Sequence, residues 1–259
     1  MKLKCLALVL LLFSTFTVAQ NTEIPNTELN LNALSEHFLE KIRNGESTAA
    51  IQKQLATLEL ETLVNNLKTD KQKLAFWVNT YNAYIQVILS KNPELYDNRS
   101  SFFSKDQIMI AGTAISFDKI EHGIIRRSQS KLGLGYVKKG FPDRFEKSLR
   151  VKNPDYRIHF ALNCGAKDCP PVSIYTPDNL DVQFSKSTAL FLKRSSKYDP
   201  AEKEVYVTSL FSWFRGDFGG KDGVKEILKD LGIIPSIDEV DLTYKDYDWT
   251  LALDNFIDL

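Results

Sequence analysis

Apolar residues recur at helical spacing in the N-terminal part of the chain. One such series predicts a helix from Leu31 to about Asn44-Gly45, and Ser47 is a suitable cap for a second helix. The apolar faces of these two helices are formed by Leu31, Leu34, Phe38 and Ile42 and by Ile51, Leu55 and Leu58. The chain therefore begins its fold with short amphipathic helices.

The clearest helical pattern covers about residues 71–90 and ends before Pro93. Its apolar positions are Leu74, Trp77, Val78, Tyr81, Ile85 and Ile88. We predict a core helix. Asn79, Asn82 and Gln86 form a polar stripe on it, which is either a solvent face or a set of amides lining a cleft.

The middle of the chain changes to strand-like patterns. Residues 108–117 predict a hairpin that turns at 111–113, and Asp118 with Glu121 resembles a capping box at the start of a short helix. Residues 156–164 predict a strand that delivers a loop, because Gly165 and Pro170-Pro171 interrupt the pattern.

The C-terminal part contains both helix-like and strand-like patterns of apolar residues. Thr176-Pro177 signals a helix with Leu180, Phe184, Phe191 and Leu192 on its buried side, and a strand at 205–209 precedes helices at 210–218 and 223–231. Because strands and helices do not alternate regularly, we predict one α+β domain over residues 31–259. In it N-terminal helices pack with a small, mainly antiparallel sheet, and a papain- or transglutaminase-like arrangement is one form this could take.

The first residues of the chain have a pattern typical of an export leader and not of a folded element. Lys2 and Lys4 precede an apolar run that is too short to span a bilayer, and Thr17-Val18-Ala19 has the small-x-small pattern of a cleavage site. We predict a signal peptide at 1–19, a tether at 20–30, and an exported protein, periplasmic or extracellular, without a stable membrane anchor after cleavage.

The charge and composition of the chain limit the classes of partner that it is expected to bind. The formal net charge is zero, and the pairs Arg126-Arg127, Lys138-Lys139 and Lys193-Arg194 are too scattered to form a nucleic-acid surface, so we assign them to the solvated surface. No cofactor is implied, and the predicted partner is a small molecule or a peptide. The 43% apolar content and 16 phenylalanines suffice for a substantial core.

The reactive side chains cluster. Beyond the leader the chain has two cysteines and three histidines, and four of these five residues lie between 122 and 169: His122, His159, Cys164 and Cys169. His37 lies on the polar flank of the first helix, where a solvated histidine is expected.

Three motifs resemble the domain-of-unknown-function-547 family: residues 75–83 (AFWVNTYNA), residues 120–126 (IEHGIIR) and residues 159–171 (HFALNCGAKDCPP). Weaker similarity follows at 210–214, 217–218 and 247–249. The resemblance covers about residues 60–250 and implies no particular activity.

Cys164, which ends the predicted strand and precedes Gly165, suits a nucleophile. His122 or His159 could accept its proton, and Glu121, Asn79 or Asn82 could orient the imidazole. His122 is the better base candidate, because a strand would point His159 away from Cys164.

Two other roles compete for the same cysteines. In an oxidising compartment Cys164 and Cys169 could form a disulfide, and with His122 and His159 they could bind zinc, although the spacing is not that of a familiar zinc motif. Two functions follow. The first is a thiol hydrolase or acyl transferase acting on amides or esters, with Asn79 or Asn82 at the oxyanion. The second is a non-catalytic secreted binding module with a Cys164-Cys169 disulfide and an aromatic groove near Trp213, Phe214 and Trp249.

Overall fold

The computed structural model describes residues 29–259. The predicted signal peptide and most of the predicted tether lie outside the described residues. The described helices are α1 (Leu31–Arg43), α2 (Ala49–Thr57), α3 (Leu60–Asn66), α4 (Asp70–Lys91), η1 (Pro93–Asn98), α5 (Arg99–Ser104), η2 (Lys119–Ile125), α6 (Arg144–Leu149), η3 (Tyr156–Phe160), α7 (Leu180–Ser195), α8 (Leu210–Trp213) and α9 (Gly220–Asp230). The strands are β1 (Ile108–Ile110), β2 (Thr113–Ile115), β3 (Lys197–Asp199), β4 (Glu204–Val207) and β5 (Asp241–Tyr244).

Helix α4 is the centre of the larger part of the molecule, as its apolar pattern predicts. Thr69 and Gln72 form a capping box at its start, and α1 packs along it. Its middle is buried on all sides, so that Asn79, Asn82 and Gln86 are at most 1% exposed. The polar stripe is therefore not a solvent face.

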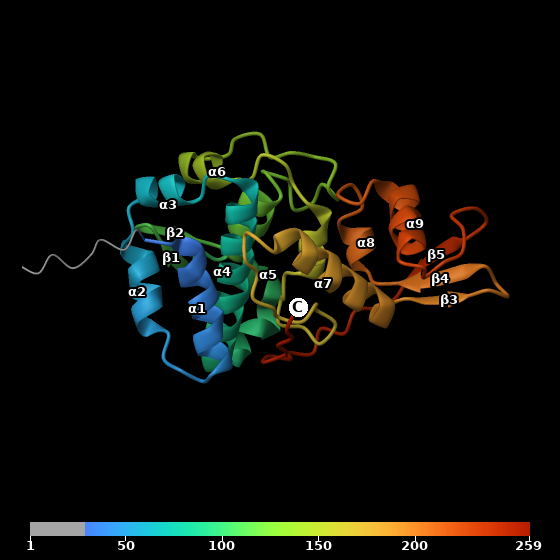
Figure 1. Ribbon diagram of the computed structural model, residues 1–259, viewed down its shortest axis with the longest axis horizontal. Helices are drawn as coiled ribbons and strands as arrows, with labels where there is room; N and C mark the ends of the chain where they lie inside the picture. Colours follow the sequence, from blue (N-terminus) through green and yellow to red (C-terminus); the bar gives the residue numbers. More distant parts are fainter. Residues whose placement is uncertain (1–28) are drawn as a thin grey trace, which may run out of the picture.

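Two small sheets lie at opposite ends of the molecule (Figure 1). Strands β1 and β2 form the predicted hairpin beside α2. Strand β4 pairs antiparallel with β3 and parallel with β5. The fold is α+β, as predicted.

The core consists of two hydrophobic clusters, one near each of the two small sheets. The larger surrounds α4, and the smaller joins α8, α9 and β3–β5 around Phe211 and Phe218. Helix α7 and η3 pack against each other between them (Figure 1). No helix among residues 29–259 is long and apolar enough to cross a membrane.

Two local predictions are wrong. Residues 156–160 form the 3-10 helix η3 instead of a strand, because Asp155 caps it by accepting from the backbone N–H of Arg157. Asp118 makes no capping hydrogen bond to η2. Its carboxylate binds Lys131 instead, at 2.7 Å from Nζ.

Candidate functional site

A cavity of about 230 Å³ lies where the two hydrophobic clusters approach each other. Its polar lining comes from η2, η3, the loop at 164–169 and the paired side chains of Asp118 and Lys131. Its apolar lining comes mainly from α4, α5, α8 and the segment at 247–249. The lining includes Glu121, His122, His159, Cys164 and Cys169. The fold thus brings together predicted site residues from two separate sequence motifs.

Behind the cavity, four side chains form a buried polar network. Arg126 donates from Nε to Asp217 Oδ2 at 2.6 Å and from Nη2 to Oδ1 at 3.1 Å. It also donates from Nη1 to His122 Nδ1 at 2.8 Å. His159 Nε2 lies 2.7 Å from Asp217 Oδ2. These contacts tie η2 and η3 to the turn after α8.

The local backbone of η2 places Arg126 in this network. η2 is a π-helix, in which the N–H of Arg126 bonds to the carbonyl of Glu121 and the N–H of Ser128 to that of Gly123. Arg126 is consequently only 2% exposed, so its assignment to the solvated surface is wrong.

The network determines the proton positions. Since arginine only donates, His122 Nδ1 must accept and its proton is on Nε2. Burial, together with the charge of Arg126, lowers the pKa of His122 to about 4. Burial also lowers the pKa of His159, against the opposing effect of Asp217. Both imidazoles are therefore neutral at pH 7.

Asp217 is ionised. Burial opposes its ionisation, but the hydrogen bonds from His159 and Arg126 outweigh this effect and lower its pKa to about 2. Its carboxylate therefore accepts from His159 Nε2, which leaves His159 Nδ1 unprotonated. Asp217 and Arg126 neutralise each other inside the protein.

Glu121 is the polar residue of the cavity that has no such partner. Its side chain is 15% exposed, and it makes no hydrogen bond to another side chain or backbone group among residues 29–259. His122 Nδ1 lies 3.6 Å from Glu121 Oε1, but that nitrogen already accepts from Arg126. Burial raises the pKa of Glu121. A carboxyl in this state can bind a ligand that donates a hydrogen bond or carries a positive charge.

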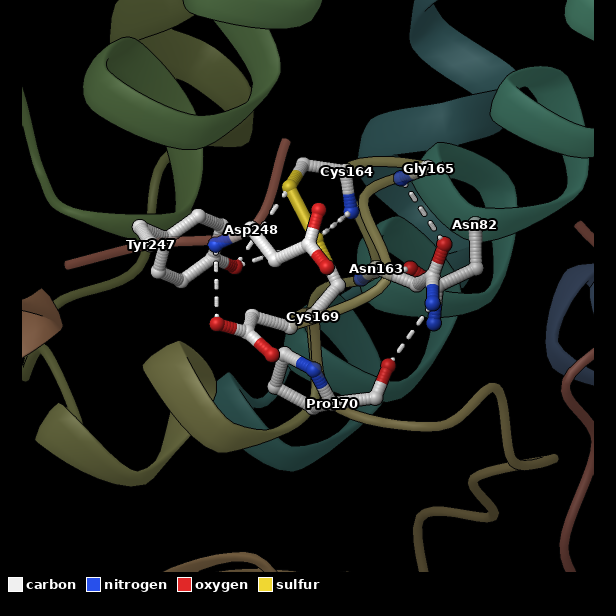
Figure 2. The surroundings of a disulfide bond; sticks show 9 residues. Asn82, Asn163, Cys164, Gly165, Cys169, Pro170, Tyr247 and Asp248 are labelled. Atoms are coloured by element: carbon white, nitrogen blue, oxygen red, sulfur yellow. Dashed lines mark hydrogen bonds between the residues drawn. A yellow bond between two sulfur atoms is a disulfide. The ribbon is translucent and has the colours of Figure 1, made fainter. Parts of the chain in front are cut away.

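Cys164 and Cys169 form a disulfide in the cavity wall, with 6.0 Å between their Cα atoms (Figure 2). The two sulfurs differ in environment. Cys169 is 1% exposed, whereas Cys164 is partly exposed. Tyr247 Oη lies 3.3 Å from Cys169 Sγ and 3.8 Å from Cys164 Sγ. In this state Cys164 has no thiolate.

The disulfide loop is also held by hydrogen bonds (Figure 2). Asn163 donates from Nδ2 to the carbonyl of Pro170 at 2.7 Å and accepts from the N–H of Gly165 at 3.0 Å, which closes the base of the loop. Asn82 supports it from α4 by accepting from the N–H of Asn163 at 2.8 Å.

The C-terminal segment covers the other side of the loop. The N–H of Lys167 bonds to the carbonyl of Thr250, and the N–H of Ala252 bonds to the carbonyl of Gly165. Asp168 accepts from the N–H of Asp248 at 2.8 Å (Figure 2). This pairing places Tyr247 beside the disulfide.

Asn79 and Asn82 do not line the cavity. Asn79 donates to the carbonyl of Tyr175 at 2.8 Å and accepts from its N–H at 2.9 Å. Asn82 donates to the carbonyl of Ala161 at 2.9 Å in addition to its contact with Asn163. Both amides are thus occupied by backbone groups, which they hold in position.

The aromatic residues of the predicted groove also lie at this cavity. Trp213 stacks on Trp249 with 5.4 Å between ring centroids, and Tyr247 contacts both rings. Phe214 stacks on His159 at 4.0 Å. The aromatic rings thus contact one another and line the same cavity as Glu121.

Sequence reasoning missed Arg126, Asp217 and Tyr247 as site residues, although each stands within a family-like motif. The available signal was the motifs themselves, since Arg126 lies four residues after His122 in one motif and Asp217 and Tyr247 lie in the weaker similar segments. The zinc alternative gains no support, because no group of three or more His, Cys, Asp or Glu side chains among residues 29–259 is arranged to hold a metal ion. His37 is exposed and lies 3.3 Å from Glu40, away from the site.

Comparison with known proteins adds a family. The family model described as "Protein of unknown function, DUF547" matches residues 64–192, which include α4, η2 and the disulfide loop. Neither the curated proteins nor the solved structures contain a match.

Proposed function

The chain belongs to the DUF547 family of proteins of unknown function, and we propose that it is an exported binding protein whose cavity takes a small cationic group attached to an apolar ring. The observation that carries this proposal is the unpaired carboxyl of Glu121 in an aromatic-walled cavity. A carboxylate beside apolar walls favours a ligand that supplies an ammonium or amidinium charge.

Cavity size limits the ligand. About 230 Å³ is smaller than the range of roughly 300–1,000 Å³ for drug-sized ligands, and larger than a cavity of about 150 Å³ that holds benzene. The bound group is therefore the size of one amino-acid side chain, presented by a small molecule or a peptide.

The proposal includes export. The support is the leader pattern at residues 1–19 and the disulfide, since disulfides are typical of proteins outside the cytoplasm. Cell fractionation with mass spectrometry of the mature N-terminus tests this part. A product that retains Met1 and fractionates with the cytoplasm would contradict it.

Binding is tested by calorimetry with three matched probes: phenethylamine, 2-phenylethanol and phenylacetate. We expect phenethylamine to bind most tightly at pH 7. Glu121→Gln should weaken the binding of phenethylamine about tenfold and leave the affinity for 2-phenylethanol unchanged, because one charge-assisted hydrogen bond contributes about 1.5–3 kcal/mol. Glu94→Gln, at an exposed position in η1, is the control. Equal affinity for the three probes, or no effect of Glu121→Gln, would overturn the proposal.

A second candidate, a thiol hydrolase or acyl transferase, is favoured by one observation: Cys164, His159 and His122 line the same cavity. It requires the reduced state. The Cys164 thiolate would attack the acyl carbon and expel an alcohol or amine, and water would then hydrolyse the thioester. His159, oriented by Asp217 and unprotonated at Nδ1, is the better base, because His122 Nδ1 is occupied by Arg126.

This candidate is tested by reducing the protein with a phosphine and measuring the release of p-nitrophenol from p-nitrophenyl acetate. Cys164→Ala should abolish the release, whereas Cys169→Ala should retain it. Equal rates in the two variants would eliminate Cys164 as a nucleophile.

A further inference from the structure

We infer that the Cys164–Cys169 disulfide is a redox-active site that exchanges with small or protein-bound dithiols. This activity is separate from cation binding by Glu121. It rests on the unequal surroundings of the two sulfurs, on the hydrogen bonds to one of them, and on the way in which the loop is held.

Access favours attack at Cys164. Both cysteines line the cavity, but Cys164 is partly exposed whereas Cys169 is 1% exposed. An incoming thiolate therefore reaches Cys164 Sγ first, and Cys169 becomes the leaving group. A disulfide that served only as a staple would gain nothing from an accessible sulfur in a cavity wall.

Two donors point at the leaving sulfur. The backbone N–H of Cys164 lies 3.0 Å from Cys169 Sγ, and Tyr247 Oη lies 3.3 Å from it (Figure 2). Both hydrogen bonds strengthen when negative charge develops on Cys169, and this stabilisation offsets the cost of forming a buried thiolate. Exchange is faster when the leaving thiol is more acidic, so the arrangement promotes cleavage at this bond.

The loop does not depend on the disulfide for its shape. Asn163 closes its base by hydrogen bonds to Gly165 and Pro170, and the loop backbone pairs with residues 248–252. The reduced loop can therefore keep Cys164 and Cys169 close enough to re-form the bond, which a catalytic or regulatory disulfide requires.

The reaction is balanced as two exchange steps. One thiolate of a dithiol attacks Cys164 Sγ, the bond between Cys164 and Cys169 breaks, and its electron pair leaves on Cys169. The second thiol of the dithiol loses its proton and attacks the dithiol's first sulfur, which is bonded to Cys164 in the mixed disulfide. This attack expels Cys164 as the leaving group. The dithiol is oxidised to a disulfide, the protein is reduced to two thiols, and the reverse steps with an oxidised partner regenerate the protein.

The first test measures the rate at which dithiothreitol reduces the native protein, with the new thiols trapped by alkylation. Tyr247→Phe keeps the ring and removes the hydroxyl, and should slow reduction about tenfold, the effect of one hydrogen bond to a charged group. Tyr244→Phe is the matched control, since the buried hydroxyl of Tyr244 has no hydrogen-bond partner among residues 29–259. Its rate should stay within about twofold of the native rate.

The second test does not need a Tyr247 variant. A monothiol, 2-mercaptoethanol, is added to native protein, and peptide mass spectrometry locates the mixed disulfide. We expect it on Cys164, at a rate independent of low urea concentrations. Attachment to Cys169, reduction that requires unfolding by urea, or equal rates in Tyr247→Phe and Tyr244→Phe would each overturn the inference. Neither test contains an amine ligand, and both are read from the thiols and the mixed disulfide, so the result does not depend on the binding proposal. Glu94→Gln, at an exposed position outside the cavity, should exchange at the native rate.

Discussion

Arg126 and Asp217 form a bidentate ion pair inside the protein, and this pair connects the π-helix η2 to the turn after α8. The Nε–Oδ2 and Nη2–Oδ1 distances are 2.6 and 3.1 Å, and the Arg126 side chain is 2% exposed. His122 and His159 attach to the same pair from opposite ends. The histidines of the cavity are therefore oriented by a buried charge pair and not by each other.

Asp217→Asn should destabilise the protein by about 3–5 kcal/mol, because it leaves the charge of Arg126 buried without its partner. Urea unfolding followed by circular dichroism measures the loss. The control is Glu239→Gln, which breaks the exposed pair with Lys203 and should cost less than about 1 kcal/mol. A similar cost for the two variants would contradict the described network.

A pH effect follows from His122. Its pKa falls from the ordinary value of 6.5 to about 4 in the folded protein. Between these values the unfolded chain binds a proton that the folded protein does not, so this residue makes stability fall as the pH falls. From pH 7 to pH 5 its contribution should decrease by about 2 kcal/mol.

The measurement is the free energy of unfolding at the two pH values in native protein and in His122→Asn, whose side-chain oxygen can still accept from Arg126. From pH 7 to pH 5 the variant should lose about 2 kcal/mol less stability than the native protein loses. An unchanged pH dependence in His122→Asn would show that His122 is protonated equally in both states.

The sequence predicted elements well where one physical signal dominated. The apolar period of α4 and its end before Pro93 located the core helix, the same period located α1, and the strand-like pattern at 108–117 located the hairpin. Residues 156–160 failed because strand-prone side chains were outweighed by the cap from Asp155.

The site was predicted only in part for a related reason. His122, His159 and Cys164 could be selected by residue type, but the burial of Arg126 depends on Asp217, which is 91 residues away in the chain. Hydrophobic periodicity carries no information about a polar pair formed at that separation. The π-helical backbone of η2, which moves Arg126 inward, is likewise invisible to a pattern based on the α-helical period.

Asn82 should be a structural residue, and its loss should be costly. Asn82→Ala leaves the N–H of Asn163 and the carbonyl of Ala161 buried without partners, with an expected loss of about 2–4 kcal/mol by urea unfolding. Asn92→Ala is the comparison, because the exposed Asn92 makes only a 3.4 Å contact to the carbonyl of Ile88. Native-like stability of Asn82→Ala would refute the positioning role and return the amide to the candidates for chemistry.

Gly165 provides a test of the loop geometry that the redox inference needs. Its φ of +85° is in the left-handed region, and a Cβ atom there would lie 3.1 Å from Leu89 Cδ1. Gly45 has a φ of +69° with nothing within 4 Å of a Cβ atom, so Gly45→Ala isolates the cost of the backbone conformation, about 1–2 kcal/mol. Gly165→Ala should cost about 1 kcal/mol more, since it also displaces Leu89 from its packing.

Because the displaced backbone directly follows Cys164, Gly165→Ala should also change the rate of reduction by dithiothreitol, whereas Gly45→Ala should not. Equal stability and equal exchange rates in the two alanine variants would mean that the loop adapts freely and that its geometry does not hold the two sulfurs in place.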